Sequence, residues 1–290
     1  MEQQEFLDWL GTYTDANLFL ESLLHKKDSF RVNTLKISNH IFDTVSQLKC
    51  HKLSWYADAR ICPQPIQLGN TFEYFLGYLH PQGLSSMIPP LVLAPEENDY
   101  VLDICASPGS KATQIAALMK NGGTLVANDL PEREMAIVPN IARLGVLNVI
   151  VTNRDAKEYP LKREFTKVLA DVPCTALGSK LHARERFSLQ MAGRMSAAQE
   201  KIILKSFDSL VEGGTLVYST CTVAPQECEE VVQFLLHCRE EAHVENIALD
   251  MPHENGLSEY GSEIAKTWRV YPQHIGSEGF YIAKISKGSL

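Results

Sequence analysis

The chain has 290 residues, of which 45% are hydrophobic and 21% are charged. This composition excludes a disordered chain, and the length suits one large domain or two unequal ones. The formal net charge of −8 excludes a uniformly basic nucleic-acid binder but is compatible with a local basic groove. No window approaches the ~18 uninterrupted apolar residues of a membrane span, and the acidic start is unlike a targeting signal. We therefore expect a soluble cytoplasmic protein.

Seven cysteines are spread along the chain, and no two of them form a CxxC pair. The odd number and the spacing favour free intracellular thiols over a disulfide framework or a zinc cluster. We therefore expect no metal, and we expect one or two of the thiols to be reactive.

The first 80 residues predict a small α+β unit. Helical stretches over 2–10 and 16–25 come first. An extended segment at 31–37, a helix over 38–49 and short strands near Leu53 and Ile66 follow. The residues from His80-Pro81 onward are typical of a break in regular structure, so we place a boundary there, between domains 1–80 and 81–290.

From Tyr100 onward, strands are expected to alternate with helices. Five apolar runs have the composition of strands, namely 100–105, 124–129, 147–152, 167–172 and 215–220. Four segments have helical spacing, namely 111–120, 131–145, 196–210 and 225–240. A last strand is expected over 279–285. This alternation predicts an α/β fold in which helices cover both faces of a mostly parallel sheet.

The expected carboxyl ends of these strands carry unusual chemistry. The first strand runs into a turn whose Pro108-Gly109 pair lets a ligand approach main-chain NH groups at a helix start. This turn is neither GxGxxG nor a phosphate loop, which argues against a nicotinamide enzyme. Later strand ends carry three acids and two cysteines, namely Asp129, Asp155, Asp171, Cys174 and Cys221. Each acid alone could cap a helix, but together these residues predict a functional site at one edge of the sheet.

In this order, DICASPGSK, ANDLPERE, NRDA, DVPCTALG and GGTLVYSTCTVAPQECEE resemble the motifs of the Nol/Nop/Sun RNA (cytosine-C5) methyltransferases. RVNTLK, HPQGLSSMIPPLVLAPEENDYVLD and EGFYIAKI extend the likeness over nearly the whole chain. The family more often has AAPGGK and PCSG, where this chain has Ser107, Ser110 and Thr175-Ala176. These exchanges are between small residues, and we expect them to preserve binding. The resemblance implies a Rossmann-like class I methyltransferase with a mostly parallel seven-stranded sheet and an N-terminal RNA-recognition-like domain.

The resemblance also implies roles for the two cysteines. Cys221 would attack carbon 6 of cytosine, and Cys174 would assist release of the product. DNA cytosine methyltransferases attack from a Pro-Cys motif, so Cys174 stays open as the rival nucleophile. A thiolate needs a nearby cation or helix N-terminus, and the helix expected from Pro225 could lower the pKa of Cys221. Asp171 and Lys111 would hold the edge of the base, although Lys111 could instead be a solvated lysine.

S-adenosylmethionine is the cofactor that the resemblance implies. Its methionine end would bind the loop formed by Cys105, Ala106, Ser107, Pro108, Gly109, Ser110 and Lys111. Asp129 would bind the ribose hydroxyls beside Arg133. Asp155 would face the adenine, and Asp171 would lie between the cofactor and the target base.

Two basic stretches could hold RNA, although a solvated surface is the alternative for each. One comprises Lys180, His182, Arg184, Arg186 and Arg194, and the other comprises Lys26, Lys27, Arg31 and Lys36. The short chain resembles the archaeal-type tRNA methyltransferases, so we expect a monomer that acts on tRNA, with no membrane or metal partner. The alternatives are an rRNA methyltransferase, a DNA cytosine methyltransferase and a non-catalytic RNA-binding assembly factor that retained the fold.

Overall fold

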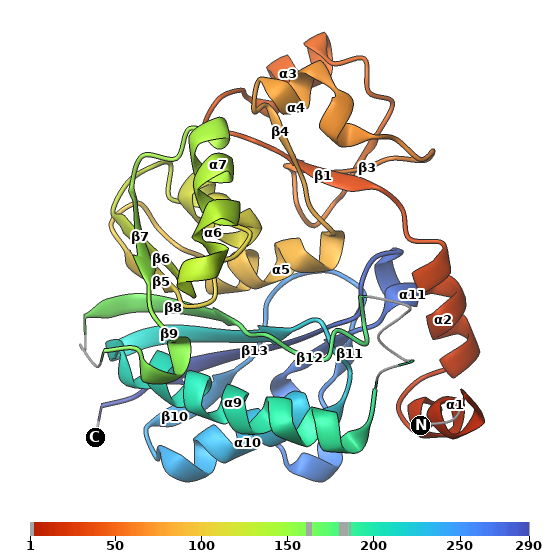
Figure 1. Cartoon of the computed structure of the whole chain (residues 1–290), viewed down its shortest axis with the longest axis vertical. Helices are drawn as coiled ribbons and strands as arrows, with labels where there is room; N and C mark the ends of the chain where they lie inside the picture. Colours follow the sequence, from red (N-terminus) through yellow and green to blue (C-terminus); the bar gives the residue numbers. More distant parts are fainter. Residues whose placement is uncertain (1–2, 161–163, 180–184, 186, 290) are drawn as a thin grey trace.

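The computed structural model describes residues 3–160, 164–179, 185 and 187–289. Within this part of the chain, two sheets organise the molecule (Figure 1). The small sheet has the order β2-β3-β1-β4, and all its pairings are antiparallel. Its strands are β1 (Ser29–Val32), β2 (His51–Lys52), β3 (Ala59–Ile61) and β4 (Leu79–Pro81). The helices α3 (Asn39–Val45) and α4 (Phe72–Phe75) and the 3₁₀ turn η1 (Leu68–Asn70) accompany it.

Strand β4 contains His80 and Pro81, where the sequence predicted a break in regular structure. Pro81 is tolerated because it ends an edge strand, where a missing NH group leaves no ladder bond unmade. Tyr56, Ala59, Leu84 and Met87 form a buried cluster that joins this sheet to helix α5 (Leu84–Leu93). The division at residue 80 stays a prediction.

The first two helices contact the other part of the chain. Helices α1 (Gln3–Leu10) and α2 (Ala16–Leu24) form where the sequence predicted them, and Asp15 caps α2 by accepting from two main-chain NH groups. Their buried residues pack with Phe187, Val223 and Tyr271. In Figure 1 they lie beside α11 (Pro272–Ile275), away from the small sheet.

The large sheet has nine strands within the described residues, in the order β11-β12-β13-β9-β8-β5-β6-β7, with β10 paired to β13. Five parallel strands form one side: β5 (Tyr100–Asp103), β6 (Thr124–Asp129), β7 (Val149–Asn153), β8 (Phe165–Asp171) and β9 (Leu210–Thr220). Four antiparallel strands form the other: β10 (Ala242–Glu245), β11 (Glu254–Asn255), β12 (Trp268–Val270) and β13 (Phe280–Lys287). The sheet therefore has more strands than the predicted seven, because short strands such as β10 and β11 extend its antiparallel side.

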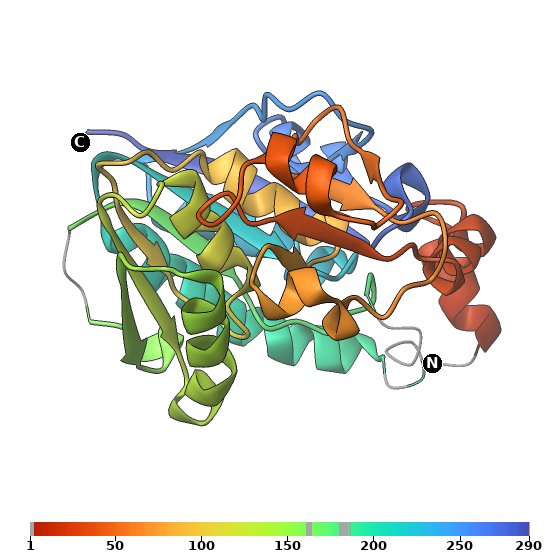
Figure 2. The same ribbon diagram turned by 90° about the horizontal axis from the view of Figure 1, so that it is seen from above.

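Helices cover both faces of the large sheet (Figures 1 and 2). Helices α5, α6 (Ser110–Leu118) and α7 (Glu134–Leu144) share one apolar core with the sheet, and α9 (Leu189–Asp208) and α10 (Glu229–Cys238) share the other. Helix α9 begins at Leu189, seven residues before the predicted start at Ser196. The 3₁₀ turns in this part are η2 (Pro131–Arg133), η3 (Ala156–Glu158), η4 (Pro225–Glu227), η5 (Ser258–Tyr260) and η6 (Ile264–Lys266).

Strand β5 marks the point where the strand order reverses. The chain runs outward from β5 to β6 and β7, and then returns to place β8 on the other side of β5. In open parallel sheets, ligands bind beyond the carboxyl ends of the strands at such a point. The predicted site residues follow these strands.

Candidate active site at the carboxyl edge of the sheet

The two cysteines after β8 and β9 face one another. The strands pair in parallel, with Asp171 opposite Ser219. This pairing brings Cys174 Sγ within 3.3 Å of Cys221 Sγ. The hydroxyl of Ser179 also donates to Cys221 Sγ, at 3.7 Å. The geometry therefore lets one thiol donate a hydrogen bond to the other sulfur.

This contact shifts the pKa values of the two thiols in opposite directions. The hydrogen bond from Cys174 is the largest effect on Cys221 and lowers the pKa of that thiol, against the opposing effect of burial. The same hydrogen bond, followed by burial, raises the pKa of Cys174 well above its ordinary value. Cys221 is therefore the better thiolate, and Cys174 is the better proton donor.

The source of this asymmetry differs from the prediction. We expected the N-terminus of a helix at Pro225 to lower the pKa of Cys221. Residues Pro225–Glu227 form a 3₁₀ turn, and α10 begins only at Glu229. The pKa of Cys221 is lowered instead by a hydrogen bond from a second thiol, which lies far away along the chain and is brought into contact by the fold.

Lys111 and Asp171 form an ion pair beside the cysteines. Lys111 Nζ lies 2.7 Å from Asp171 Oδ2 and donates to Ser86 Oγ at 2.8 Å. The hydroxyl of Ser219 donates to the other oxygen of Asp171, also at 2.8 Å. Because Lys111 is only 9% exposed, the alternative of a solvated first-turn lysine is wrong. The pair presents one cation and one carboxylate at the edge of the cysteine site.

The loop after β5 is held by the acid that ends β6. Ser107 donates its main-chain NH to Asp129 Oδ2 at 2.8 Å, and Leu130 donates its NH to Oδ1 at the same distance. Gly109 has φ +99°, which a residue with a side chain rarely adopts. Arg133 Nη1 lies 3.8 Å from Asp129 Oδ1. Asp129 thus shapes the loop and still offers the remaining lone pairs of its two oxygens to a ligand.

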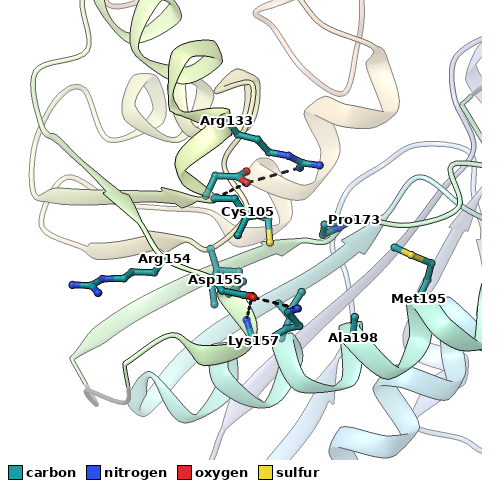
Figure 3. A pocket seen from close by; sticks show the side chains of 13 residues that line it. Cys105, Arg133, Arg154, Asp155, Lys157, Pro173, Met195 and Ala198 are labelled. Carbon is teal, nitrogen blue, oxygen red and sulfur yellow. Dashed lines mark hydrogen bonds and ion pairs between the residues drawn. The ribbon is translucent and has the colours of Figure 1, made fainter.

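A cavity of about 230 Å³ opens next to this loop (Figure 3). Its polar lining includes Asp129 and Asp155, with Arg133 and Arg154 beside them. Its apolar lining includes Ile104, Leu130, Pro173, Met195, Ala198 and Ile202. Acceptors for hydroxyl or amino groups beside an apolar wall fit a nucleoside. The residues present therefore fit S-adenosylmethionine.

Asp155 and Cys105 both line the cavity, and each also has a structural role. Asp155 Oδ1 accepts from the main-chain NH of Lys157 at 2.9 Å, so the capping alternative is observed, and the same residue lines the cavity. Cys105 also lines the cavity, and burial raises its pKa well above the ordinary value. This shift agrees with a packing role for Cys105 and argues against a nucleophilic one.

The two predicted basic stretches have different outcomes. Four members of the first, Lys180, His182, Arg184 and Arg186, lie outside the described residues, while Arg194 is exposed on α9 beside the cavity residue Met195. In the second, Arg31 is fully buried and donates to Gln82 Oε1 at 3.3 Å and Thr113 Oγ1 at 3.1 Å. The prediction that Arg31 is a surface cation is wrong, because every residue of β1 is buried.

Three side chains of the site were not predicted from the sequence. Ser86 and Ser219 hold the Lys111–Asp171 pair, and Asp103 is fully buried at the end of β5. Burial, followed by the nearby Asp171, raises the pKa of Asp103 to about 8. The position of Asp103 at a strand end was the available signal, but its burial became visible only in the fold.

None of the helices in the described part of the chain is long and apolar enough to cross a membrane. No group of three or more His, Cys, Asp or Glu side chains among the described residues is arranged to hold a metal ion.

Comparisons with known proteins agree with this geometry. Residues 90–286 match the family described as 16S rRNA methyltransferase RsmB/F. The chain is 40% identical to a tRNA (cytosine(49)-C(5))-methyltransferase of Pyrococcus abyssi, over 77% of this chain and 74% of the relative. It is 34% identical to the ribosomal RNA small subunit methyltransferase F of Shewanella woodyi, over 98% of this chain but only 63% of that longer relative.

Solved structures extend the likeness to the whole fold. A methyltransferase homolog protein from Pyrococcus horikoshii has a TM-score of 0.84 at 30% identity, over 99% of this chain and 100% of the other. NSun6 from Pyrococcus horikoshii, solved with the S-adenosylmethionine analogue SFG, has a TM-score of 0.88 at 25% identity, over 100% and 98% of the two chains. The chain therefore belongs to this family of S-adenosylmethionine-dependent RNA (cytosine-C5) methyltransferases.

Proposed function

We propose that this enzyme methylates carbon 5 of a cytosine in tRNA, with Cys221 as the nucleophile and Cys174 as the release group. The observation that carries the proposal is the 3.3 Å contact between the two sulfurs, together with the opposite pKa shifts of the two thiols. The alternative in which Cys174 attacks would require the thiol with the raised pKa to ionise first.

In the attack step, the Cys221 thiolate adds to carbon 6 of the cytosine and makes carbon 5 nucleophilic. Asp171 accepts a hydrogen bond from the amino edge of the base, and Lys111 donates to its carbonyl oxygen. Their 2.7 Å contact keeps both groups at one place beside the sulfur. The cofactor supplies the electrophilic methyl group that carbon 5 takes up.

In the release step, carbon 5 loses its proton to water, and the ring double bond forms again. The bond between carbon 6 and the Cys221 sulfur breaks, and its electron pair returns to that sulfur. Cys174, held as a thiol at 3.3 Å, donates a hydrogen bond to the departing thiolate. The free enzyme is restored in this way.

The cavity beside the loop is proposed to hold the cofactor. Asp129 would bind the ribose hydroxyls beside Arg133, and Asp155 would face the adenine against the apolar wall. The methionine end would lie along the loop Cys105, Ala106, Ser107, Pro108, Gly109, Ser110 and Lys111. Asp171 would lie between the cofactor and the target base.

The choice of tRNA is supported by the identity to the Pyrococcus abyssi enzyme, and the alternative of rRNA by the likeness to the Shewanella woodyi enzyme. Labelled S-adenosylmethionine should transfer methyl groups to total tRNA and not to rRNA or DNA. Bisulfite mapping of RNA from a strain without this gene should show an unmethylated tRNA cytosine. Loss of methylation only in rRNA would replace the tRNA proposal by its alternative.

RNA phosphates are proposed to contact Lys180, Arg184, Arg186 and Arg194, which follow the Pro173-Cys174 motif. Arg194 is exposed beside the cavity, which supports this placement. The double variant Arg184→Ala, Arg186→Ala should lower RNA affinity and reduce the slope of its salt dependence by roughly one unit for each lost contact. An unchanged slope of the salt dependence would show that Arg184 and Arg186 are ordinary solvated side chains that do not contact RNA phosphates.

We further propose a monomer that acts in the cytoplasm, with residues 1–80 as an RNA-positioning domain and 81–290 as the catalytic domain. One chain contains both cysteines and the cavity, which supports a monomer. Light scattering at assay concentration measures the oligomeric state, and a stable dimer would contradict the proposal. Deletion of residues 1–28 would test the domain division. Because α1 and α2 make buried contacts with Val223 and Tyr271, we expect this deletion to lower the stability of the catalytic domain.

A further inference from the structure

A buried polar cluster lies directly behind the two cysteines. Its four side chains are each less than a tenth exposed, and they are Thr175, Gln199, Thr222 and Glu227. The Glu227 carboxylate accepts a hydrogen bond from the main-chain NH of Thr175 at 2.9 Å and another from Gln199 Nε2 at 3.0 Å. Gln199 Nε2 also donates to the carbonyl of Pro173 at 2.8 Å. The cluster therefore holds the main chain on both sides of Cys174.

The same cluster joins the two cysteine loops. Thr175 and Thr222 each follow one of the cysteines, and their hydroxyl oxygens lie 2.9 Å apart. The main-chain NH of Ala224 can only donate, and it donates to Thr222 Oγ1 at 3.4 Å. Thr222 can therefore donate to Thr175, whose hydroxyl donates in turn to Glu227. The chain of hydrogen bonds ends on a carboxylate, which only accepts when it is ionised.

Glu227 acts on one cysteine more than on the other. Burial raises the pKa of Glu227, while hydrogen bonds from Thr175 and Gln199 favour its charged form. The carboxylate adds to the raised pKa of Cys174, after the larger effects of Cys221 and burial. The largest effect on the pKa of Cys221 comes instead from the hydrogen bond with Cys174. A negative charge behind Cys174 keeps that thiol protonated.

We propose that Glu227 is a positioning residue that holds Cys174 as a protonated thiol against Cys221, ready to donate to the departing sulfur. This inference rests on the roles proposed above for the two cysteines. As the bond from Cys221 to carbon 6 breaks, its electron pair returns to the sulfur and the Cys174 S–H group hydrogen-bonds to it. Glu227 is fully buried, so it acts through Cys174 and the polar cluster rather than by touching the substrate.

The first test uses the full chain, total tRNA and labelled S-adenosylmethionine. Glu227→Gln keeps the shape of the side chain but removes the charge and replaces one acceptor by a donor. Single-turnover methyl transfer should stay within about threefold of wild type, while steady-state turnover falls about tenfold and a protein–RNA adduct accumulates on denaturing electrophoresis. Glu230→Gln is the matched control, because its carboxylate accepts from Tyr260 and should leave all three readouts unchanged.

The second test needs no RNA. Iodoacetamide alkylation of Cys174 in the free protein, followed by peptide mass spectrometry, reports its thiolate fraction. Alkylation at pH 8 should be about three- to tenfold faster in Glu227→Gln, because one pKa unit changes the thiolate fraction tenfold. In the RNA assay of the first test, Thr175→Val, which removes the hydroxyl link, should accumulate the adduct to a smaller extent than Glu227→Gln. Thr175→Ser keeps the hydroxyl and should release product faster than Thr175→Val.

Several outcomes would overturn the proposal. If Glu227→Gln folds but shows neither an accumulated adduct nor faster alkylation of Cys174, Glu227 does not have the proposed role. Equal losses of single-turnover transfer and of turnover would make Glu227 a general structural support instead. If Glu227→Gln does not fold, Thr175→Val carries the same test. If Cys174→Ala itself forms no adduct, the proposed cysteine roles fail, whereas the alkylation assay still measures the link between Glu227 and Cys174.

Discussion

The proposed cofactor cavity and the cysteine pair lie at the same edge of one sheet, but they are built differently. In the cavity, Asp129 accepts hydrogen bonds from main-chain NH groups of the loop after β5 and of its own loop, and Asp155 accepts one from its own loop. The same carboxylates therefore shape the loops and line the cavity. The cysteines instead face each other in front of a buried polar cluster. A change in the cavity should thus weaken binding by degrees, whereas a change at the cysteines should alter which step of the reaction is slow.

Apart from the two cysteines, the largest effect is expected between these two regions, at Lys111. Lys111→Met removes the cation that pairs with Asp171 and should lower kcat/KM by about 10²–10³-fold, as does the loss of one donor in other active sites. Lys120→Met is the control, because Lys120 forms an exposed ion pair with Glu97. Steady-state kinetics on tRNA measure both variants. If Lys111→Met lowered kcat/KM by tenfold or less, the ion pair would not take part in the chemical step.

The pH dependence of stability should report the charge state of the buried Asp103. The pKa of Asp103 is raised to about 8 in the folded protein, so folding loses stability as the pH rises from about 4 to 8. Asp103→Asn should remove this loss, and the variant should gain roughly 3 kcal/mol relative to wild type between pH 5 and pH 8. Urea unfolding at the two pH values tests this difference. The exposed Asp250→Asn is the control.

Asp129 should show the graded behaviour expected of the cavity. Asp129→Ala removes the acceptor of the Ser107 NH group and the proposed acceptor of the ribose hydroxyls, so it should weaken cofactor binding by ~1–3 kcal/mol. Asp129→Asn keeps one acceptor oxygen and should lose less. Calorimetric titration with S-adenosylhomocysteine measures the affinity, and the exposed neighbour Glu132→Ala is the control. An unchanged affinity of Asp129→Ala would contradict the assignment of the cavity.

The smallest effect concerns the pKa of Cys221. Its lowered pKa depends first on the hydrogen bond from Cys174 and, to a smaller extent, on that from Ser179. Cys174→Ala should therefore raise the pH at which Cys221 is half alkylated, and Ser179→Ala should raise it less. The thiolate is present above the pKa, so a raised pKa slows alkylation at neutral pH. A larger shift with Ser179→Ala would reverse the order of the two donors.

Much of the parallel core could be predicted, because local patterns determine it. The run 124–129 is a strand with the predicted ends, and Gly145 ends α7 in a left-handed conformation. Helix α5 was not predicted, because Pro89 and Pro90 are typical of a break. The fold compensates for Pro90, since Gln82 Nε2 donates to the Ser86 carbonyl that the missing NH group would have bonded. That donor comes from outside the helix, beyond any local pattern.

The candidate site shows the same limit. The positions after the strands indicated Asp129, Asp155 and Asp171, because parallel strands end at one edge of a sheet. The burial of Arg31 and the contact between the two thiols depend on neighbours far away along the chain. Such partners are set by packing, so the sequence alone could name the residues but not their charge states.

The most direct test of the account compares two variants in one adduct assay. Cys221→Ala and Cys174→Ala are incubated with tRNA and S-adenosylmethionine and analysed by denaturing electrophoresis. If Cys221 attacks and Cys174 assists release, Cys221→Ala forms no covalent RNA adduct, and Cys174→Ala methylates once and remains bound to the RNA. An adduct with Cys221→Ala and none with Cys174→Ala would contradict the account and make Cys174 the nucleophile.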